Sequence, residues 1–416
     1  MKRMADMLDY LDWRGDIPFS ADPFNEVDSL ILSEVAYVDF AGIVPGPDDS
    51  FGSEAMPLNA VPVVSVPDAV RRYWELHTEA EIQSSNTLYK MAPYVLDKLC
   101  SGARFGEMYL GGYVNKVSSE KNEQMAAITY FLSDGTAFTA FRGTDDTLVG
   151  WKEDFTFSFM KETAGQKSAA EYLDRMFGTR EEPHSSAAGK GGFTDLGADY
   201  PIRVGGHSKG GNFAVFAAAF CAPETRKRIV QVYSNDGPGL LEEITKTDAY
   251  REILPRVHSV VPEESLFGIL LDSGYYHKVI KSSQKGLWQH DALSWQIKRN
   301  HFEEAEKISE GSLMLKKTIE TWVYGMTPEQ RRETVDIIFT ILEDTGFENV
   351  SEFASEHFKS IGELARAYSE LSGEEKRIFH ETGLRLLKSG ASSIAEELQD
   401  QITKQIEKMQ HGGLIG

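Results

Sequence analysis

The sequence contains little cysteine and no long hydrophobic segment. Its two cysteines, Cys100 and Cys221, are too few for a disulfide framework, and no Cys/His spacing typical of a metal site is present. The longest apolar run, 213–222, is too short to span a membrane, and the first residues lack the apolar stretch of a signal peptide. These features predict a soluble, cytoplasmic protein without a transmembrane segment.

Positive charge is also scarce. The chain has 43 Lys and Arg against 64 Asp and Glu, which gives a formal net charge of −21. Such an acidic protein repels a phosphate backbone, so nucleic acid is not expected as a partner. The glycine-rich segment 189–192 lacks the Lys-Ser/Thr ending of a phosphate-binding loop. Hydrophobic residues make up 41% of the chain, enough for a substantial core.

The spacing of apolar residues changes along the chain. Helical spacing covers 25–40, 68–100 and 169–177, whereas strands are predicted at 108–117, 125–132, 137–142, 228–234, 256–261 and 275–283. Strands that alternate with helices predict an α/β fold with a mostly parallel central sheet and helices on both faces.

We therefore expect an α/β domain over residues 1–300. Within it, 1–25 is predicted to be an irregular lead-in and 145–200 a cap or loop insertion. Residues 301–416 read as charged amphipathic helices and form an all-α C-terminal extension. This extension could serve as a lid, as a docking module for a partner, or as a surface for homo-oligomer formation.

The clearest chemical motif is Gly206-His207-Ser208-Lys209-Gly210. A β-type segment precedes it and a helix-forming run follows, so the serine stands at a sharp strand-to-helix turn. Glycines on both sides allow the close passage of strand and helix there. This context predicts Ser208 as a nucleophile, with the backbone N–H of Lys209 as one oxyanion donor. The alternative is a glycine-rich turn that holds a bystander serine.

A nucleophilic serine needs a histidine base. His258 and His277 fall inside predicted strands, whereas His290 lies in a loop after the last strand and is favoured; His301 is the second candidate. His207 is expected to be structural and to point away from the site.

The acid that orients the histidine has two candidate positions. Asp236 follows one predicted strand, and Glu263 and Glu264 follow the next. A carboxylate after either strand can reach the base, and we favour Asp236. Asp291 is next to the base along the chain, so it is poorly placed to orient the same ring.

Several segments of the chain resemble two known families. Phe141-Arg142-Gly143-Thr144, with Trp151 and Asp154 downstream, and the Gly-His-Ser-x-Gly-Gly elbow are similar to the class 3 lipases. The Mbeg1-like group of α/β-hydrolase proteins resembles the chain more widely. The similar stretches are 11–16, 142–154, 206–211, 235–239 and 289–291 with Trp295.

The resemblance implies an α/β-hydrolase fold. It also implies that Thr144 contributes to the oxyanion hole through its N–H and its hydroxyl, and that His290 is the base. Where class 3 lipases carry their aspartate, this chain has Pro-Glu-Glu-Ser at 262–265. The structural alternative for the Thr144 segment is an ion pair between Arg142 and Asp154 that shapes the loop.

Together these features predict a serine hydrolase of the esterase or lipase-like kind. Ser208, His290 and Asp236 would cleave a carboxylic ester of a small molecule or lipid through an acyl-enzyme, with no metal or organic cofactor. A thioesterase or serine peptidase remains open. A non-catalytic protein that keeps the fold and binds a partner is the competing class.

Overall fold

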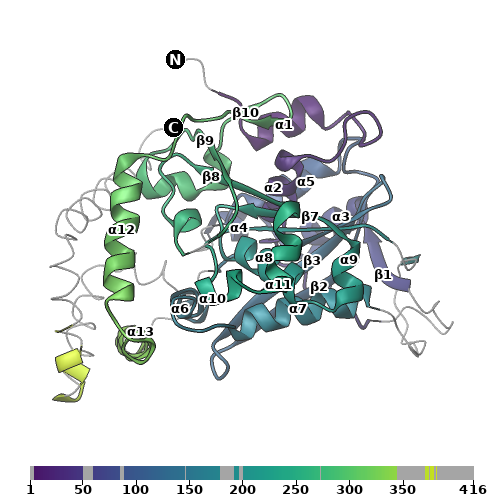
Figure 1. Ribbon diagram of the computed structural model, residues 1–416. Coiled ribbons are helices and arrows are strands. Elements are labelled where there is room, and N and C mark those ends of the chain that lie inside the picture. Colours follow the sequence, from purple (N-terminus) through teal and green to yellow (C-terminus); the bar gives the residue numbers. More distant parts are fainter. Residues whose placement is uncertain are drawn as a thin grey trace.

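The computed structural model describes residues 4–49, 60–84, 89–145, 147–178, 192–195, 200–271, 273–343, 371–373, 375–378 and 381 (Figure 1). In this part of the chain, nine strands form the central sheet. They are β1 (Ala60–Ser65), β2 (Tyr109–Ser118), β3 (Glu123–Phe131), β4 (Ala137–Phe141), β5 (Gly192–Asp195), β6 (Ile202–His207), β7 (Ile229–Asn235), β8 (Val257–Pro262) and β9 (His277–Ile280).

The strands are ordered β5-β1-β2-β3-β4-β6-β7-β8-β9 across the sheet. The pairings from β4 through β9 are parallel, and those from β5 through β4 are antiparallel. Only β1 and β3 among these nine described strands therefore run against the others. The expected α/β architecture with a mostly parallel sheet agrees with this topology.

Helices cover both faces of the sheet (Figure 1). One face carries α1 (Met7–Arg14), α2 (Glu26–Val35), α3 (Val66–Leu76) and α5 (Ala92–Leu99). The other carries α6 (Leu148–Thr156), α7 (Ala164–Phe177), α8 (Lys209–Phe220) and α11 (Asp248–Ile253). Shorter helices are α4 (Glu79–Ser84), α9 (Pro223–Arg228) and α10 (Glu242–Thr245).

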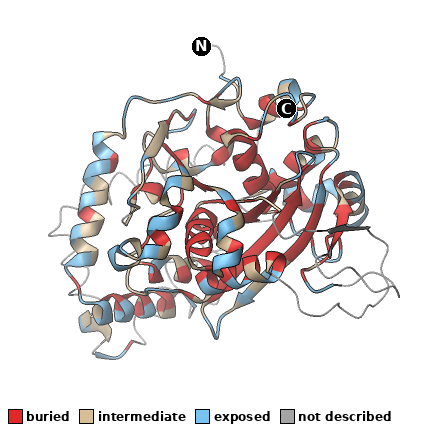
Figure 2. Ribbon diagram, turned by 45° about the vertical axis from the view of Figure 1, so that its right-hand side comes forward, coloured by how far each residue is buried: buried red, intermediate tan, exposed pale blue. Residues whose placement is uncertain are grey.

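The central strands are apolar at consecutive positions because both of their faces are covered. In β3, Ile128 and Tyr130 join the core under α2, while Ala127 and Phe131 join the core under α7 and α8. This period-two division explains why these strands read as continuous apolar runs. Figure 2 shows the central strands and α8 as the most consistently buried elements.

The N-terminal region contains more regular secondary structure than the sequence predicted. The lead-in 1–25 is not wholly irregular, because α1 forms within it. Asp6 caps this helix and Asp9 completes a capping box. Region 68–100, expected to be helical, holds parts of α3, α4 and α5, and β1 lies where no strand was predicted. Pro62 obscures this strand in the sequence, and β1 is recognisable through its pairing with β2 and β5.

The expected domain boundary at residue 300 falls within a small hairpin of β10 (Ile297–Lys298) and β11 (His301–Phe302). Phe302 is fully buried, so packing on the sheet continues past this point. The helices α12 (Glu310–Tyr324) and α13 (Pro328–Glu343) follow. Residues 179–191 and 196–199 of the expected insertion 145–200, and most of the expected extension beyond residue 343, lie outside the described residues.

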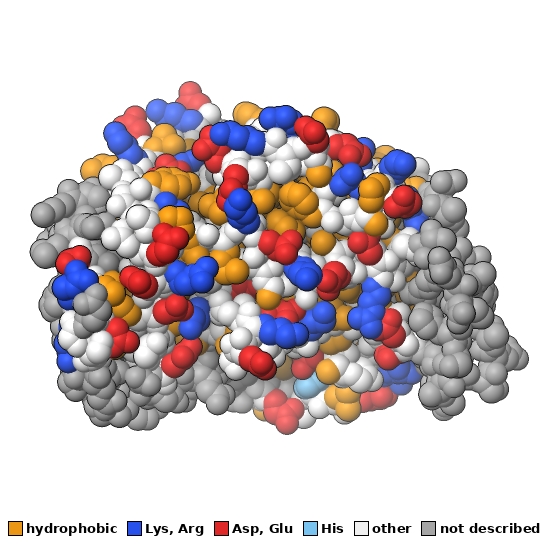
Figure 3. All heavy atoms as spheres, turned by 60° about the horizontal axis from the view of Figure 1, so that its bottom comes forward, with side chains coloured by type: hydrophobic (Ala, Val, Ile, Leu, Met, Phe, Trp, Pro, Cys, Tyr) orange, Lys and Arg blue, Asp and Glu red, His pale blue; other side chains and the backbone are white. Residues whose placement is uncertain are grey.

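The described surface mixes charges of both signs. On the face in Figure 3, acidic and basic side chains are interspersed with small hydrophobic patches. None of the described helices is long and apolar enough to cross a lipid bilayer.

A buried ion pair attaches the lead-in to the core. Arg104 and Asp28 are both fully buried, with 2.5 Å between Nη2 and Oδ2 and 2.7 Å between Nε and Oδ1. The same guanidinium donates to the carbonyl oxygens of Ile17, Asp22 and Pro23. One side chain thereby satisfies the backbone of an otherwise loop-like segment.

We expect Arg104→Met to lower the free energy of unfolding by about 3–5 kcal/mol, because Asp28 would be left as an unpaired buried charge. Arg71→Met is the matched control. Arg71 is 56% exposed and pairs with Asp68 and Glu75, so its loss should cost at most about 1 kcal/mol. Urea unfolding measures both, and equal midpoints for the two variants would contradict the prediction.

Candidate active site

The predicted site residues lie at one edge of the sheet. Strands β4, β6, β7 and β8 are parallel, and their carboxyl ends are followed by Thr144, Ser208, Asp236 and Glu264, respectively. His290 follows β9 at the end of a short 3-10 helix, Gly286–His290. Ligands in open α/β sheets bind at this edge, so the topology gathers these side chains where a site is expected.

Ser208 stands at a strained turn between β6 and α8. Its φ of 57° and ψ of −131° lie in a region that residues other than glycine rarely adopt. A β-carbon on Gly206 would come within 2.2 Å of the Gly210 backbone, and one on Gly210 within 2.0 Å of the Phe141 carbonyl oxygen. The two flanking glycines are therefore required for the close approach that presents the serine at the apex.

Asp236 and His290 are in direct contact. His290 Nδ1 lies 2.6 Å from Asp236 Oδ2, and Asp236 is fully buried. The second carboxylate oxygen accepts hydrogen bonds from Ser265 Oγ at 2.5 Å and from the Gly268 N–H at 3.1 Å. A carboxylate can only accept here, so His290 carries a proton on Nδ1 and its Nε2 has a free lone pair in the neutral ring. Among the described residues, no hydrogen bond joins His290 to Ser208.

The competing acids have other contacts. Glu264 accepts hydrogen bonds from the Gly286 N–H at 2.5 Å and from Gln289 Nε2 at 3.0 Å. It therefore braces the loop that carries His290 without touching the ring. The Glu263 backbone bonds to Ile280 and Ser309. The Asp291 carboxylate accepts from the Leu293 N–H.

The alternative histidines are engaged away from the elbow. The His258 ring stacks on Tyr233. The His277 ring lies between the hydroxyls of Ser259 and Ser273, at 2.8 Å and 3.0 Å. His301 belongs to β11, where its ring nitrogen is 3.5 Å from Asn300.

The loop after β4 lies beside the elbow. A β-carbon on Gly143 would come within 3.2 Å of the Ser208 β-carbon. The Thr144 hydroxyl donates to Asp154 Oδ2, and the Thr144 carbonyl oxygen accepts from Tyr89 at 2.7 Å. Because the hydroxyl is engaged, the backbone N–H is the Thr144 group that remains for an oxyanion. Burial raises the pKa of Asp154 to about 6.

The expected ion pair between Arg142 and Asp154 does not form, because Arg142 has other partners. Arg142 Nη2 instead lies 3.2 Å from Asp145 Oδ2 and 3.0 Å from Asn115 Oδ1. Asp145 is three residues away on the same loop and reaches the guanidinium first, whereas Asp154 sits on α6 and faces the elbow.

The Lys209 side chain connects the elbow to α6. Its ammonium is buried and lies 3.3 Å from both Glu153 Oε2 and the Gly150 carbonyl oxygen. The Glu153 carboxylate accepts further hydrogen bonds from the N–H groups of Gly165 and Gln124. A buried lysine needs such a partner. The Lys209 N–H is at the first position of α8, where the helix offers it no acceptor.

His207 contacts the candidate base, which the sequence did not indicate. His207 Nε2 donates to the His290 carbonyl oxygen at 2.9 Å, and the two ring centroids are 4.7 Å apart. His207 therefore helps to position His290 instead of pointing away from the site. The only signal for this role is its place next to Ser208.

Behind His207 lies a buried group of polar side chains. Glu34 Oε1 is 3.3 Å and the Tyr37 hydroxyl 3.4 Å from His207 Nδ1. Burial, with a smaller contribution from Asp291, raises the pKa of Glu34 to about 8. Burial also lowers the pKa of His207 to about 3. At neutral pH this contact therefore joins two uncharged groups and is not an ion pair.

The described residues contain no group of three or more His, Cys, Asp or Glu side chains arranged to hold a metal ion.

Fold and site together define an α/β protein with a candidate active site at the carboxyl ends of its parallel strands. The Mbeg1-like family model matches residues 99–340, more than half of the chain. The chain therefore belongs to the Mbeg1-like family.

Among solved structures, the chain is similar to one described as the crystal structure of M37 lipase. The two are 16% identical, and the match covers 45% of this chain and 65% of the lipase, with a TM-score of 0.30. The match thus spans just under two thirds of that lipase, and we draw no conclusion from a likeness this weak. No curated protein matches the chain.

We expect the uncharged state of Glu34 to make stability depend on pH. Its carboxyl has an ordinary pKa of 4.5 and a raised one of about 8 in the folded protein. The stabilisation is therefore complete below pH 4.5 and is lost as the pH rises through about 8. Glu34→Gln keeps a neutral group at this position and should lack this loss.

Urea unfolding of both proteins from pH 6.5 to 9 measures this effect, and His207 stays neutral over that range. The free energy of unfolding of Glu34→Gln should rise relative to wild type as the pH increases. A constant difference across the range would show that Glu34 does not titrate there.

Proposed function

We propose that this protein is a serine hydrolase of the α/β-hydrolase fold that cleaves a carboxylic ester. The observation that carries the proposal is the buried contact between Asp236 and His290 at the edge where Ser208 occupies a strained elbow. The chain order Ser208, Asp236, His290 is the order typical of that fold. Strain at a non-glycine residue is characteristic of functional sites and supports the same role.

In the proposed mechanism, Ser208 Oγ attacks the ester carbonyl carbon and its proton passes to His290 Nε2. Asp236 keeps the other ring proton on Nδ1, which leaves Nε2 as the proton acceptor and stabilises the imidazolium. A rotation of the Ser208 hydroxyl or a bound substrate has to complete the serine–histidine hydrogen bond, as is common in ligand-free sites.

The carbonyl oxygen becomes negatively charged as the tetrahedral intermediate forms. The N–H groups of Lys209 and Thr144 are proposed to stabilise it, since both border the elbow. The ester C–O bond then breaks and the alcohol leaves with the proton from His290. A water molecule, deprotonated by His290, attacks the acyl-enzyme and releases the carboxylic acid together with free Ser208.

The competing proposal is a non-catalytic protein that retains the fold and binds a partner. A fluorophosphonate probe separates the two, because it labels only an activated serine. We expect stoichiometric labelling of the wild-type protein and none of Ser208→Ala. Lack of labelling in folded wild-type protein, together with no turnover of a series of esters, would exclude the enzyme. Turnover of thioesters or amides without esters would instead indicate a thioesterase or peptidase.

We expect Asp236→Asn to lower kcat by about 10³–10⁴-fold, because the histidine proton would no longer be fixed on Nδ1. Glu264→Gln should have a much smaller effect, since it alters only the support of the His290 loop. The neighbouring Glu263→Gln is the matched control and should stay near wild type. Ester hydrolysis by the three variants measures the ranking, and a larger fall in Glu264→Gln would make Glu264 the acid.

A further inference from the structure

A cavity of about 430 Å³ opens at the candidate nucleophile and runs beneath the C-terminal helices. Ser208, Lys209 and Asp154 border it on the side of the sheet. The opposite wall comes from α12 and α13, which lie outside the layered core (Figure 1). This volume is within the range of about 300–1,000 Å³ that is usual for small-molecule sites.

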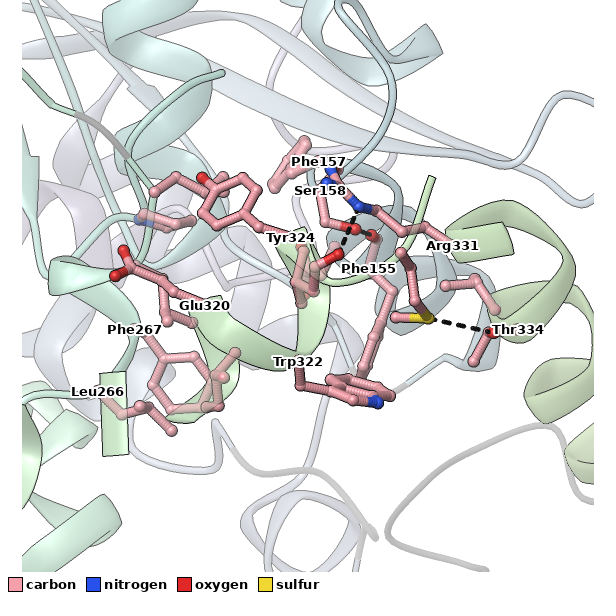
Figure 4. A pocket seen from close by; sticks show the side chains of 18 of the residues that line it. Phe155, Phe157, Ser158, Leu266, Phe267, Glu320, Trp322, Tyr324, Arg331 and Thr334 are labelled. Atoms are coloured by element: carbon pink, nitrogen blue, oxygen red, sulfur yellow. Dashed lines mark hydrogen bonds between the residues drawn. The ribbon is translucent and has the colours of Figure 1, made fainter. Parts of the chain in front are cut away.

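The lining is almost entirely apolar. Figure 4 shows the side chains of Phe155, Phe157, Phe267, Trp322 and Tyr324 around the pocket. Aliphatic side chains complete the wall, and they include Leu266, Leu270, Leu315, Ile319, Val335 and Ile338.

The polar side chains that α12 and α13 contribute to the wall already have partners, and Glu320 among them lies 3.7 Å from the Lys316 ammonium. On the side of α6, Trp151 Nε1 and Asp154 Oδ1 are buried without a hydrogen-bond partner among the described residues. The Thr318 hydroxyl donates to the Met314 carbonyl oxygen, and the Thr334 hydroxyl faces the Met326 sulfur. Arg331 donates to the carbonyl oxygens of Val323 and Ser158 (Figure 4). The wall formed by α12 and α13 is therefore hydrophobic and offers little to recognise a polar or charged group, which favours a hydrocarbon chain along this part of the cavity.

Contacts with α6 hold α13 in this position. The rings of Phe155 and Phe339 are 5.7 Å apart between centroids, and the Lys152 ammonium is 3.7 Å from the carboxylates of Asp336 and Glu343. The far wall of the cavity is thus attached to the same helix that carries Asp154.

We propose that α12 and α13 form the acyl-chain site of the enzyme and select esters of medium to long unbranched acids. The inference rests on the proposed ester hydrolysis at Ser208 and adds the substrate class. With the ester carbonyl at Ser208, the acyl chain extends along the cavity toward Ile319 and Ile338. The C-terminal helices, which are not part of the sheet and its covering layers, thereby determine specificity.

The test uses p-nitrophenyl acetate, butyrate, octanoate and decanoate. In wild type, kcat/KM should rise by about fourfold for each added methylene that the cavity accepts, because burying one methylene stabilises by about 0.8 kcal/mol. Ile319→Trp and Ile338→Trp fill the cavity from α12 and α13, respectively. Each should lower the ratio of kcat/KM for decanoate to that for acetate by at least tenfold.

Leu313→Trp is the matched control. Leu313 is on α12 but is 49% exposed and does not line the cavity, so its variant should keep the wild-type ratio. A second series, acetates of alcohols of increasing length, tests the direction of the chain. A rise in kcat/KM with alcohol length alone would overturn an acyl site.

Fluorophosphonate labelling distinguishes the two proposals. If wild type is labelled and hydrolyses acetate, but chain length has no effect or both tryptophan variants keep the wild-type ratio, the acyl site is wrong and the serine hydrolase stands. If wild type is not labelled, the proposed function itself fails. Labelling of each tryptophan variant shows that it is folded with an intact elbow, so a lower ratio reports the cavity.

Discussion

The burial of one carboxylate determines how the candidate site is assembled. Asp236 is removed from water, so its oxygens need donors from the protein. These come from the His290 ring, the Ser265 hydroxyl and the Gly268 N–H, all on segments that follow later strands of the sheet. Satisfying this carboxylate therefore fixes the loops after β7, β8 and β9 relative to one another. The position of His290 is a consequence of that requirement.

Two adjacent carboxylates on α6 connect the elbow to the cavity. Glu153 and Asp154 are adjacent on α6, and they bind Lys209 of the elbow and Thr144 of the neighbouring loop, respectively. The same helix packs against α13. A shift of α13 would therefore strain contacts that also place the two proposed oxyanion donors. The wall of the cavity and the electrostatics of the elbow are mechanically linked through α6.

Much of the fold and of the candidate site could be predicted from the sequence, because both depend on local patterns. Apolar runs identified the buried strands, and strand-end loops in a parallel sheet necessarily share an edge. The contact of Asp236 with His290 could not be derived in this way. Glu264 follows the adjacent strand and was the less favoured candidate, and only the three-dimensional packing shows that it binds Gly286 and Gln289 instead. The partner of Arg142 was mistaken for the same reason.

The role of His207 shows most clearly what a sequence pattern omits. Its donation to the His290 carbonyl oxygen requires a proton on Nε2, and hence an acceptor at Nδ1. The Tyr37 hydroxyl makes the hydrogen bond at Nδ1, and the buried Glu34 carboxyl lies 3.3 Å from the same nitrogen. Glu34 on α2, Tyr37 just after α2 and His207 on β6 thus meet behind the site. The contact of Tyr37 with His207 thus favours the tautomer in which His207 donates to the His290 carbonyl oxygen. No sequence motif in either segment predicts this contact.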